Sequence, residues 1–235
     1  MPLMLENPKE TIIFYDLDGT LIPGSDAAMG DPFHRYLHRH TASHLTLEDF
    51  LAENERLCAH HQTASSIEAW RRHHGKDSTW AYNHFRDVAP ELAAAVIDAV
   101  TEDDALNTLL DEQLSLGYTL GLITQSFSSY RNVVMDHAKL LPFFNPEYMF
   151  GQDELNAVKT NPQAYTIPMQ AVGHRFRHHH MVENIAINLH QARLHNFGTW
   201  LTNTDLPEDV SYVDYHHETI HDTCRAINQR ARAQA

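Results

Sequence analysis

The sequence predicts an α/β fold in which helices cover both faces of a parallel β-sheet and a helical segment is inserted after the first strand. Short apolar, β-branched runs alternate with helix signals over most of the chain, which is the pattern of strand–helix–strand units. The first run, residues 11–15, is apolar, β-branched or aromatic throughout, as in a strand with both faces buried. Residues 32–100 carry almost no strand signal, so we expect several helices there.

The other strands are predicted where apolar runs end in polar residues or glycine. The clearest of these runs covers residues 118–124, and shorter or weaker ones cover residues 148–150, 180–182, 198–201 and 211–213. The C-terminal residues 218–232 are predicted to form a helix.

Several helix starts are predicted from capping residues. Ser65, followed three residues later by Glu68, forms a capping-box pattern inside the helical segment. Ser126 is predicted to cap the helix that follows residues 118–124. Residues 161–162 (Asn-Pro) have the composition of another helix start, with Asn as the cap and Pro in the first turn.

The composition is that of a folded, acidic chain. Hydrophobic residues make up 43% and charged residues 20% of the 235 residues, which argues against disorder. The net charge of −14 argues against a basic face for nucleic acid polymers. The two cysteines are too few for a disulfide scaffold, and residues 1–10 lack the apolar run of a signal peptide. No stretch approaches the roughly 18 apolar residues of a membrane span, so we expect a cytoplasmic protein without a membrane partner.

Polar side chains follow several of the predicted strands. Asp16 and Asp18 come directly after the first strand, Thr124 ends the second, and residues 183–184 (Glu-Asn) follow a later one. Lys159 lies just before a predicted helix start. Because ligands bind outside the carboxyl ends of the strands in an open α/β sheet, we expect these side chains to converge there.

These groups have the chemistry that phosphate transfer requires. A carboxylate can attack phosphorus, and a second carboxyl can protonate the leaving group and then deprotonate water. A hydroxyl and an ammonium group can hold the phosphate oxygens. Mg²⁺ prefers oxygen ligands and is commonly bound by one or two carboxylates together with a substrate phosphate.

Four segments resemble the signature motifs of the haloacid dehalogenase-like (HAD) superfamily, and they occur in the family's order. Residues 14–21 are similar to its Asp-x-Asp-Gly-Thr motif, and residues 120–124 are similar to the hydrophobic strand that ends in Thr or Ser. Residues 159–165 resemble the third motif, which begins with Lys, and residues 181–189 resemble the fourth, an acidic pair followed by Asn.

The resemblance implies a Rossmann-like three-layer parallel sheet as the core domain, residues 1–22 and 105–235. It also implies an inserted helical cap domain, residues 23–104. Such caps close over the site, exclude water and select the substrate.

The resemblance also implies a role for each site residue. Asp16 is the expected nucleophile, and Asp18 the expected general acid/base, which also gives a backbone carbonyl to the metal. Thr124 and Lys159 are expected to hold the phosphoryl group. The implied substrate contacts are Gly19, Thr20, Thr124, Gln125 and Lys159. The implied Mg²⁺ ligands are Asp16, Asp18, Glu183 and Asn184.

The implied function is Mg²⁺-dependent hydrolysis of a small phosphorylated metabolite through an aspartyl-phosphate intermediate. A nucleoside 5′-monophosphate is slightly favoured, and a sugar-phosphate phosphatase or mutase stays open. Asp18 favours phosphate transfer over carbon–halogen cleavage, because dehalogenases of the superfamily lack an aspartate at that place.

Two departures from the family's pattern leave a second class of function open. Asn184 stands where the family usually has a metal-binding aspartate, so we expect weaker Mg²⁺ binding. Thr160 stands where Pro is commoner, next to Lys159. The alternative is a regulatory or binding protein that has kept the fold and lost turnover.

Two further features allow more than one interpretation. His34 and His38, two of the 19 histidines, are four residues apart and can share a helix face, which would suit a zinc site or a metal carrier. The favoured interpretation of the histidines is a solvated surface that becomes charged below neutral pH. Asp26 is interpreted as a hinge residue, with a place at the cap entrance as the alternative.

Overall fold

Parallel strands form one sheet in the order β3-β2-β1-β4-β5-β6 in the computed structural model of the chain, which describes residues 7–63, 65–208 and 210–233. The predicted domain limits at residues 1 and 235, and most of the N-terminal segment inspected for a signal peptide, lie outside the described residues. The strands are β1 (Thr11–Tyr15), β2 (Thr119–Ile123), β3 (Met149–Phe150), β4 (His178–Glu183), β5 (Gly198–Thr202) and β6 (Tyr215–His217).

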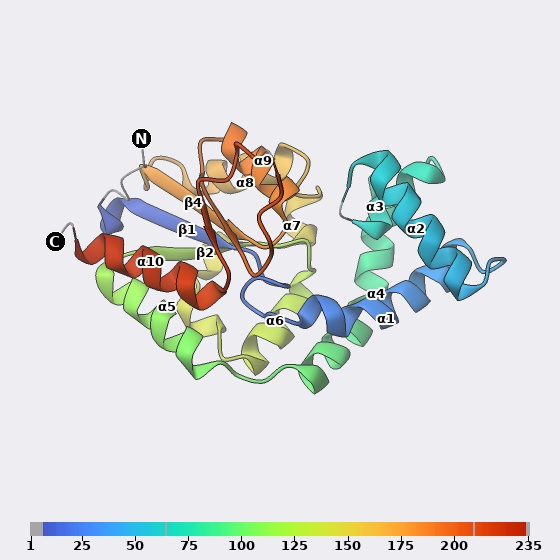
Figure 1. Cartoon of the computed structure of the whole chain (residues 1–235), viewed down its shortest axis with the longest axis horizontal. Coiled ribbons are helices and arrows are strands. Elements are labelled where there is room, and N and C mark those ends of the chain that lie inside the picture. Colours follow the sequence, from blue (N-terminus) through green and yellow to red (C-terminus); the bar gives the residue numbers. More distant parts are fainter. Residues whose placement is uncertain (1–6, 64, 209, 234–235) are drawn as a thin grey trace.

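Two layers of helices enclose this sheet, which confirms the predicted α/β architecture (Figure 1). The short 3-10 turns are η1 (Pro8–Glu10), η2 (Leu141–Phe143) and η3 (Pro146–Tyr148). The helices of the core are α5 (Asp104–Leu116), α6 (Ser128–His137), α7 (Gln152–Leu155), α8 (Gln163–Val172), α9 (Ala186–Leu194) and α10 (Ile220–Arg232).

The alternation of side chains along β1 explains the two layers. Ile13 and Tyr15 point into the apolar cluster formed with α5, α6 and α10. Ile12 and Phe14 point into the cluster formed with α8 and α9 on the other face. All four side chains are fully buried, so the uninterrupted apolar run of β1 reflects a strand covered on both sides.

The strand predicted at residues 211–213 is wrong. The last strand is β6, which pairs with β5 through Trp200 and Tyr215. Tyr212 and Val213 are apolar because they pack against the second cluster from a turn. Pairing starts only after Asp214, whose N–H donates to the carbonyl of Thr199 at 3.1 Å.

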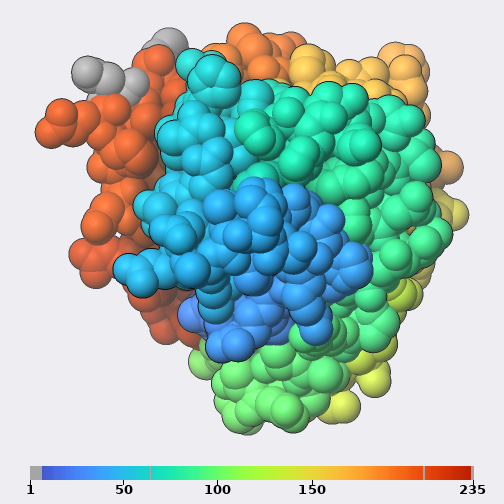
Figure 2. Space-filling model, turned by 90° about the vertical axis from the view of Figure 1, so that its right-hand side faces the viewer, coloured from blue at the N-terminus to red at the C-terminus, as the bar shows by residue number. Residues whose placement is uncertain are grey.

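Residues 25–99 form a helical unit of α1 (Ser25–Thr41), α2 (Leu47–His61), α3 (Ser66–His73) and α4 (Ser78–Ala99), with no strand among its described residues. The unit extends from one side of the sheet, and seen from that side it covers the centre of the molecule (Figures 1 and 2). Its own apolar contacts include the stacked rings of Phe50 and Trp70, whose centroids are 5.3 Å apart.

The structure agrees with some of the predicted helix caps and differs from others. Ser65 caps α3 as expected, because its Oγ accepts a hydrogen bond from the N–H of Glu68 at 3.4 Å. The carboxylate of Glu68 does not complete a capping box and instead accepts from Arg71 and Arg72, at 2.6 Å each. At α8 the N–H of Gln163 donates to the side chain of Asn161 at 2.9 Å, close to the expected helix start.

The prediction that Ser126 caps the next helix is wrong. Helix α6 begins at Ser128, and its N–H donates to the carboxylate of Asp153 at 3.1 Å. The hydroxyl of Ser126 is used elsewhere, in a bond to Asp18.

Among the described residues, no helix has the length and hydropathy needed to cross a membrane.

Candidate active site

Five of the predicted site residues line one cavity at the carboxyl ends of the central strands. Asp16 extends β1, where its N–H donates to the carbonyl of Val182 on β4 at 2.9 Å. Thr124 extends β2 in the same way toward β3. The cavity has a volume of about 360 Å³, and the five residues are Asp16, Asp18, Thr124, Gln125 and Lys159. This volume is typical of a site for a small molecule.

Lys159 joins two of the predicted acidic residues. Its Nζ lies 2.5 Å from Oδ1 of Asp16 and 2.6 Å from Oε2 of Glu183, and its side chain is only 1% exposed. A buried ammonium without a partner would carry a large desolvation cost, so both contacts are needed to keep Lys159 charged. Residues far apart in the sequence therefore meet at one point, as the motif order predicted.

The ionisation of this group follows from burial and mutual attraction. Burial alone would lower the pKa of Lys159, but the charges of Asp16 and Glu183 outweigh it, and the pKa of Lys159 is raised. Burial and the charge of Asp16 raise the pKa of Glu183, while Lys159 opposes this change. Lys159 is therefore a fixed cation beside the candidate nucleophile.

Asp18 is held by two hydroxyl groups. Ser126 Oγ donates to Oδ2 at 2.5 Å, and the hydroxyl of Tyr130 donates to Oδ1 at 2.5 Å. Burial raises the pKa of Asp18 to about 6, and the two hydrogen bonds limit the rise. A carboxyl with this pKa can give and take a proton near neutral pH, as a general acid/base must.

The turn after β1 brings Gly19 and Thr20 beside the cavity rather than into its wall. Gly19 has a φ of 72°, and its N–H donates to Ser25 Oγ at 2.9 Å. The hydroxyl of Thr20 donates to Oδ1 of Asn184 at 3.1 Å. Neither residue lines the cavity, so their contacts with substrate stay predictions.

Gly19 permits a close approach of two oxygen-bearing side chains. A Cβ built on Gly19 would lie 2.1 Å from Nδ2 of Asn184 and 2.1 Å from Oδ2 of Asp26. Asn184 Nδ2 donates to Asp26 Oδ2 at 3.1 Å, so the two side chains meet directly above the glycine. Burial and the charge of Asp16 raise the pKa of Asp26, which also lines the cavity.

The side-chain oxygens gathered beside the cavity are of the kind that binds Mg²⁺, except for those of one predicted ligand, Glu183. Asp16 and Asn184 supply carboxylate and amide oxygens of the kind that Mg²⁺ prefers. The missing side chain of Gly19 leaves room for Asn184 and Asp26. Glu183 accepts hydrogen bonds from Lys159 and from the N–H groups of Asn184 and Ile185. Its oxygens are thus already used, which disfavours Glu183 as a direct ligand.

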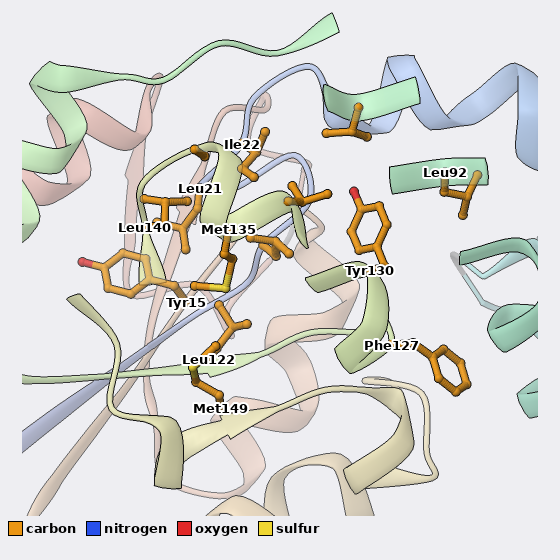
Figure 3. Close-up of a cluster of buried hydrophobic side chains, with 14 of the residues drawn as sticks. Tyr15, Leu21, Ile22, Leu92, Leu122, Phe127, Tyr130, Met135, Leu140 and Met149 are labelled. Carbon is orange, nitrogen blue, oxygen red and sulfur yellow. The ribbon is translucent and has the colours of Figure 1, made fainter. Parts of the chain in front are cut away.

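The wall opposite the carboxylates comes from the helical unit. Phe33 of α1 stacks on Phe85 of α4 with ring centroids 5.9 Å apart, and both line the cavity. Phe127 and Tyr130 lie on the side of the core that faces α4, which carries Leu92 (Figure 3). The polar side of the cavity therefore faces a largely apolar, aromatic wall.

Two buried amides of the cavity wall have atoms without a hydrogen-bond partner among the described residues. These are Oε1 of Gln125 and both amide atoms of Asn188, which is 1% exposed. A buried polar atom without a partner costs free energy, so such groups commonly face a ligand or water. Both residues line the cavity, but these particular atoms are themselves buried.

His34 and His38, the pair considered for a metal site, have different surroundings. His34 lines the cavity, whereas Nε2 of His38 lies 2.9 Å from the carbonyl oxygen of Leu45. Within the described ranges, no three His, Cys, Asp or Glu side chains are grouped so that they alone could hold a metal ion. A cation at the cavity would therefore need amide or backbone oxygens as well as carboxylates.

Comparison with known proteins gives matches at the level of structure. No protein-family model and no curated protein matches the sequence. A HAD phosphatase from Thermococcus onnurineus is 16% identical with a TM-score of 0.58, over 92% of this chain and 97% of that one. The magnesium-bound HAD-hydrolase YfnB from Bacillus subtilis is 13% identical with a TM-score of 0.60, over 93% and 98%. CbbY from Rhodobacter sphaeroides, in complex with phosphate, is 13% identical with a TM-score of 0.66, over 91% and 95%.

The chain has the fold of the HAD superfamily.

Structures that share the HAD fold with this chain also include haloacid dehalogenases, so the fold alone does not select the reaction. The site residues must make that choice. The features of this site that bear on the reaction are the lysine between two carboxylates, the hydroxyl-bound Asp18 and the position of Asn184.

Sequence reasoning missed several groups of the site. Ser126 was assigned to a helix cap, Tyr130 was not marked, and Asn188 was marked only as part of the fourth motif, although all three line the cavity. Tyr130 lies on the first turn of α6, which follows the strand end at Thr124, and this position in the chain was only a weak signal. Asp26 was interpreted as a hinge residue, but it lines the cavity, the alternative named for it.

Proposed function

We propose that this chain is a Mg²⁺-dependent phosphomonoester hydrolase that acts on a small phosphorylated metabolite through an aspartyl-phosphate. The observation that carries the proposal is the 2.5 Å contact between Lys159 Nζ and Asp16 Oδ1 in a cavity that also contains Asp18 and Thr124. A carboxylate, a cation, a hydroxyl and a second carboxyl with a raised pKa form the set that phosphoryl transfer requires.

In the first step Asp16 forms a bond to phosphorus while the bond to the leaving oxygen breaks. Lys159 and Thr124 hold the phosphoryl oxygens, where fixed donors stabilise the charge of the transition state. Asp18, when protonated, gives its proton to the departing alkoxide, so the alcohol leaves neutral. Ser126 and Tyr130 fix the carboxyl group for this transfer.

In the second step Asp18, now ionised, removes a proton from water as the water oxygen bonds to phosphorus. The bond between phosphorus and Asp16 breaks, inorganic phosphate leaves, and both carboxyl groups return to their starting states. Bound Mg²⁺ would neutralise charge on the phosphate oxygens, and Asp16, the Asp18 carbonyl and Asn184 are the groups proposed to hold it.

The cavity roof supports a substrate with a planar apolar group. Phe33, Phe85 and Phe127 offer ring surface, whereas a polyhydroxylated sugar would need hydrogen-bond partners along the same wall. We therefore favour a nucleoside 5′-monophosphate over a sugar phosphate. Residues 23–104, which contain the helical unit, are proposed to act as the cap that selects this group, in a cytoplasmic protein.

The test is hydrolysis of p-nitrophenyl phosphate and of a panel of nucleotides and sugar phosphates with Mg²⁺. Asp16→Asn should reduce turnover to the background rate, because the amide is a poor nucleophile. Asp111→Asn, which removes an exposed carboxylate from α5, is the matched control and should keep wild-type activity. Nucleoside 5′-monophosphates should give a higher kcat/KM than sugar phosphates.

One observation favours a second function. Asn184 offers no charge to a metal where an aspartate is usual, as in a binding or regulatory protein that has lost turnover. If the folded wild-type protein hydrolyses no member of the panel with Mg²⁺ yet still binds phosphate esters, the binding function replaces the enzymatic one.

A further inference from the structure

The clearest departure of this site from the family's pattern is the amide of Asn184, which does not line the cavity but contacts Asp26, which does. Its Oδ1 accepts from the hydroxyl of Thr20 at 3.1 Å, and its Nδ2 donates to Oδ2 of Asp26 at 3.1 Å. The contact with Asp26 joins the core to α1, which begins the helical unit. Asn184 is therefore held against a carboxylate that comes from a different part of the chain.

The position of Asp26 is built into the fold. It lies in the first turn of α1, and Ser25, the preceding residue, is fixed by bonds to the N–H of Gly19 and the carbonyl of Ile22, both at 2.9 Å. The space that Asp26 Oδ2 occupies exists because residue 19 has no side chain, since a Cβ there would lie 2.1 Å from that oxygen. Asp26 and Asp16 line the same cavity.

We propose that Asp26 supplies the carboxylate that position 184 lacks and acts as a ligand for the divalent cation of this site, directly or through one water molecule. The inference rests on the proposed Mg²⁺-dependent function. In this arrangement the carboxylate comes from the start of α1 instead of from the end of β4. The cation would then have as many carboxylates near it as in a site with aspartate at position 184.

The observed spacing agrees with this role. Mg²⁺ holds oxygens at about 2.0–2.1 Å in an octahedron, so neighbouring ligand oxygens are about 2.9 Å apart. The amide atom of Asn184 and Oδ2 of Asp26 are 3.1 Å apart. Rotating the amide by half a turn exchanges its nitrogen and oxygen, which would present two oxygens to a cation at nearly this spacing.

A metal-binding experiment on four proteins tests the proposal without relying on turnover. Mg²⁺ and Mn²⁺ are titrated into wild type, Asp26→Asn, Asn184→Asp and the double variant by calorimetry, and bound Mn²⁺ is followed by electron paramagnetic resonance. Asp26→Asn should weaken cation binding about tenfold or more, and Asn184→Asp should strengthen it. The double variant, with the carboxylate returned to position 184, should bind the cation about as tightly as wild type.

A control on the same helix separates ligation from net charge. Asp31→Asn removes an exposed carboxylate from α1 that pairs with Arg35, and it should leave the dissociation constant for Mg²⁺ unchanged. Thermal unfolding without metal checks that every variant is folded. If Asp26→Asn binds Mg²⁺ as tightly as wild type does, or changes only the KM for the phosphate ester, the inference is wrong and the proposed function stands. If wild type itself neither binds Mg²⁺ nor hydrolyses phosphate esters, the proposed function fails and the inference fails with it.

Discussion

At the scale of single residues, the reactivity proposed for Asp18 depends on the two hydroxyl groups that hold it. Its carboxylate is buried, and burial raises its pKa to about 6. The bond from Tyr130 at 2.5 Å opposes that rise, because a hydrogen bond to the ionised form stabilises it. We therefore propose Tyr130 as a positioning residue that acts on the reaction through Asp18.

Replacing Tyr130 with Phe should move the pH profile of the reaction. Loss of a hydrogen bond to a charged group is worth about 1.5–3 kcal/mol, so the pKa of Asp18 should rise by about one unit or more. Asp18 must be protonated for the leaving group to depart, so the alkaline limb of kcat/KM should shift to higher pH. The measurement is kcat/KM for a poor leaving group between pH 5 and 9.

Tyr118→Phe is the control, because the hydroxyl of Tyr118 is buried, has no partner among the described residues and does not line the cavity. It should leave the profile unchanged. An alkaline limb that stays in place in Tyr130→Phe would show that Tyr130 does not act on Asp18.

Most of the candidate site was predictable residue by residue, for a physical reason. Asp16 and Thr124 directly follow apolar strands, and parallel strands bring their carboxyl ends to one edge of the sheet. Tyr130 and Asp26 reach the cavity from the first turns of helices, where the direction of a side chain depends on packing. Tertiary structure decides that direction, so the local sequence carried little information about either residue.

At the scale of elements, the start of α6 positions the two hydroxyl groups that bind Asp18, the proposed acid/base. Ser126 and Tyr130 flank the first residue of this helix, and both bind Asp18. The helix start is fixed by Asp153, which accepts from the N–H of Ser128 at 3.1 Å and also bonds its hydroxyl. A carboxylate from α7 thus does the work that the sequence assigned to Ser126.

Replacing Asp153 with Ala should loosen this helix start. Loss of an N-terminal cap typically costs about 1 kcal/mol, and a carboxylate near a helix N-terminus adds favourable interaction with the helix dipole. The free energy of unfolding in urea should fall by about that amount, and kcat should fall with it because Ser126 and Tyr130 lose their anchor. Asp136→Ala, which removes an exposed carboxylate near the other end of α6, should not destabilise the protein. Equal destabilisation by both variants would rule out the capping role.

The elements differ in how well their sequences predicted them. The strand at residues 11–15 matches β1 in full, because its unbroken apolar run has no other use than burial on two faces. Residues 211–213 carry similar apolar side chains but bury them from a turn. A short apolar run indicates that its side chains are buried, but pairing with neighbouring strands determines whether its backbone forms a strand. This explains why the position of β6 was not predicted.

At the scale of the whole molecule, the burial of one histidine changes how the protein responds to acid. The histidines were expected on a solvated surface, but His180 lies in β4 and is only 5% exposed, so that expectation is wrong for this residue. Trp200 Nε1 donates to its Nδ1 at 3.2 Å, and the ring fills the space that a side chain at Gly198 would need. β4 lies inside the sheet, next to β1 and β5, and this placement buries the ring.

The free energy of unfolding should therefore depend on His180 below neutral pH. The pKa of His180 is lowered from 6.5 to about 3. Burial is the largest cause, and the nearby His178, His179 and Arg230 lower the pKa further. Between these values the unfolded chain binds a proton that the native protein does not, so stability is present above pH 6.5 and is lost as pH falls toward 3. The contribution to the slope is about 1.4 kcal/mol per pH unit.

His180→Gln keeps an acceptor for Trp200 but has no titrating group in that pH range. Urea unfolding at pH 7.5, 6.0 and 5.0 should give a shallower loss of stability in the variant than in wild type, and the difference in slope should approach about 1.4 kcal/mol per pH unit at the acid end. His44→Gln, which replaces an exposed histidine before α2, controls for the removal of an imidazole as such. Parallel curves for wild type and His180→Gln would mean that the native protein accommodates a proton on His180, and the packing of β4 against β5 would then have to open near pH 6.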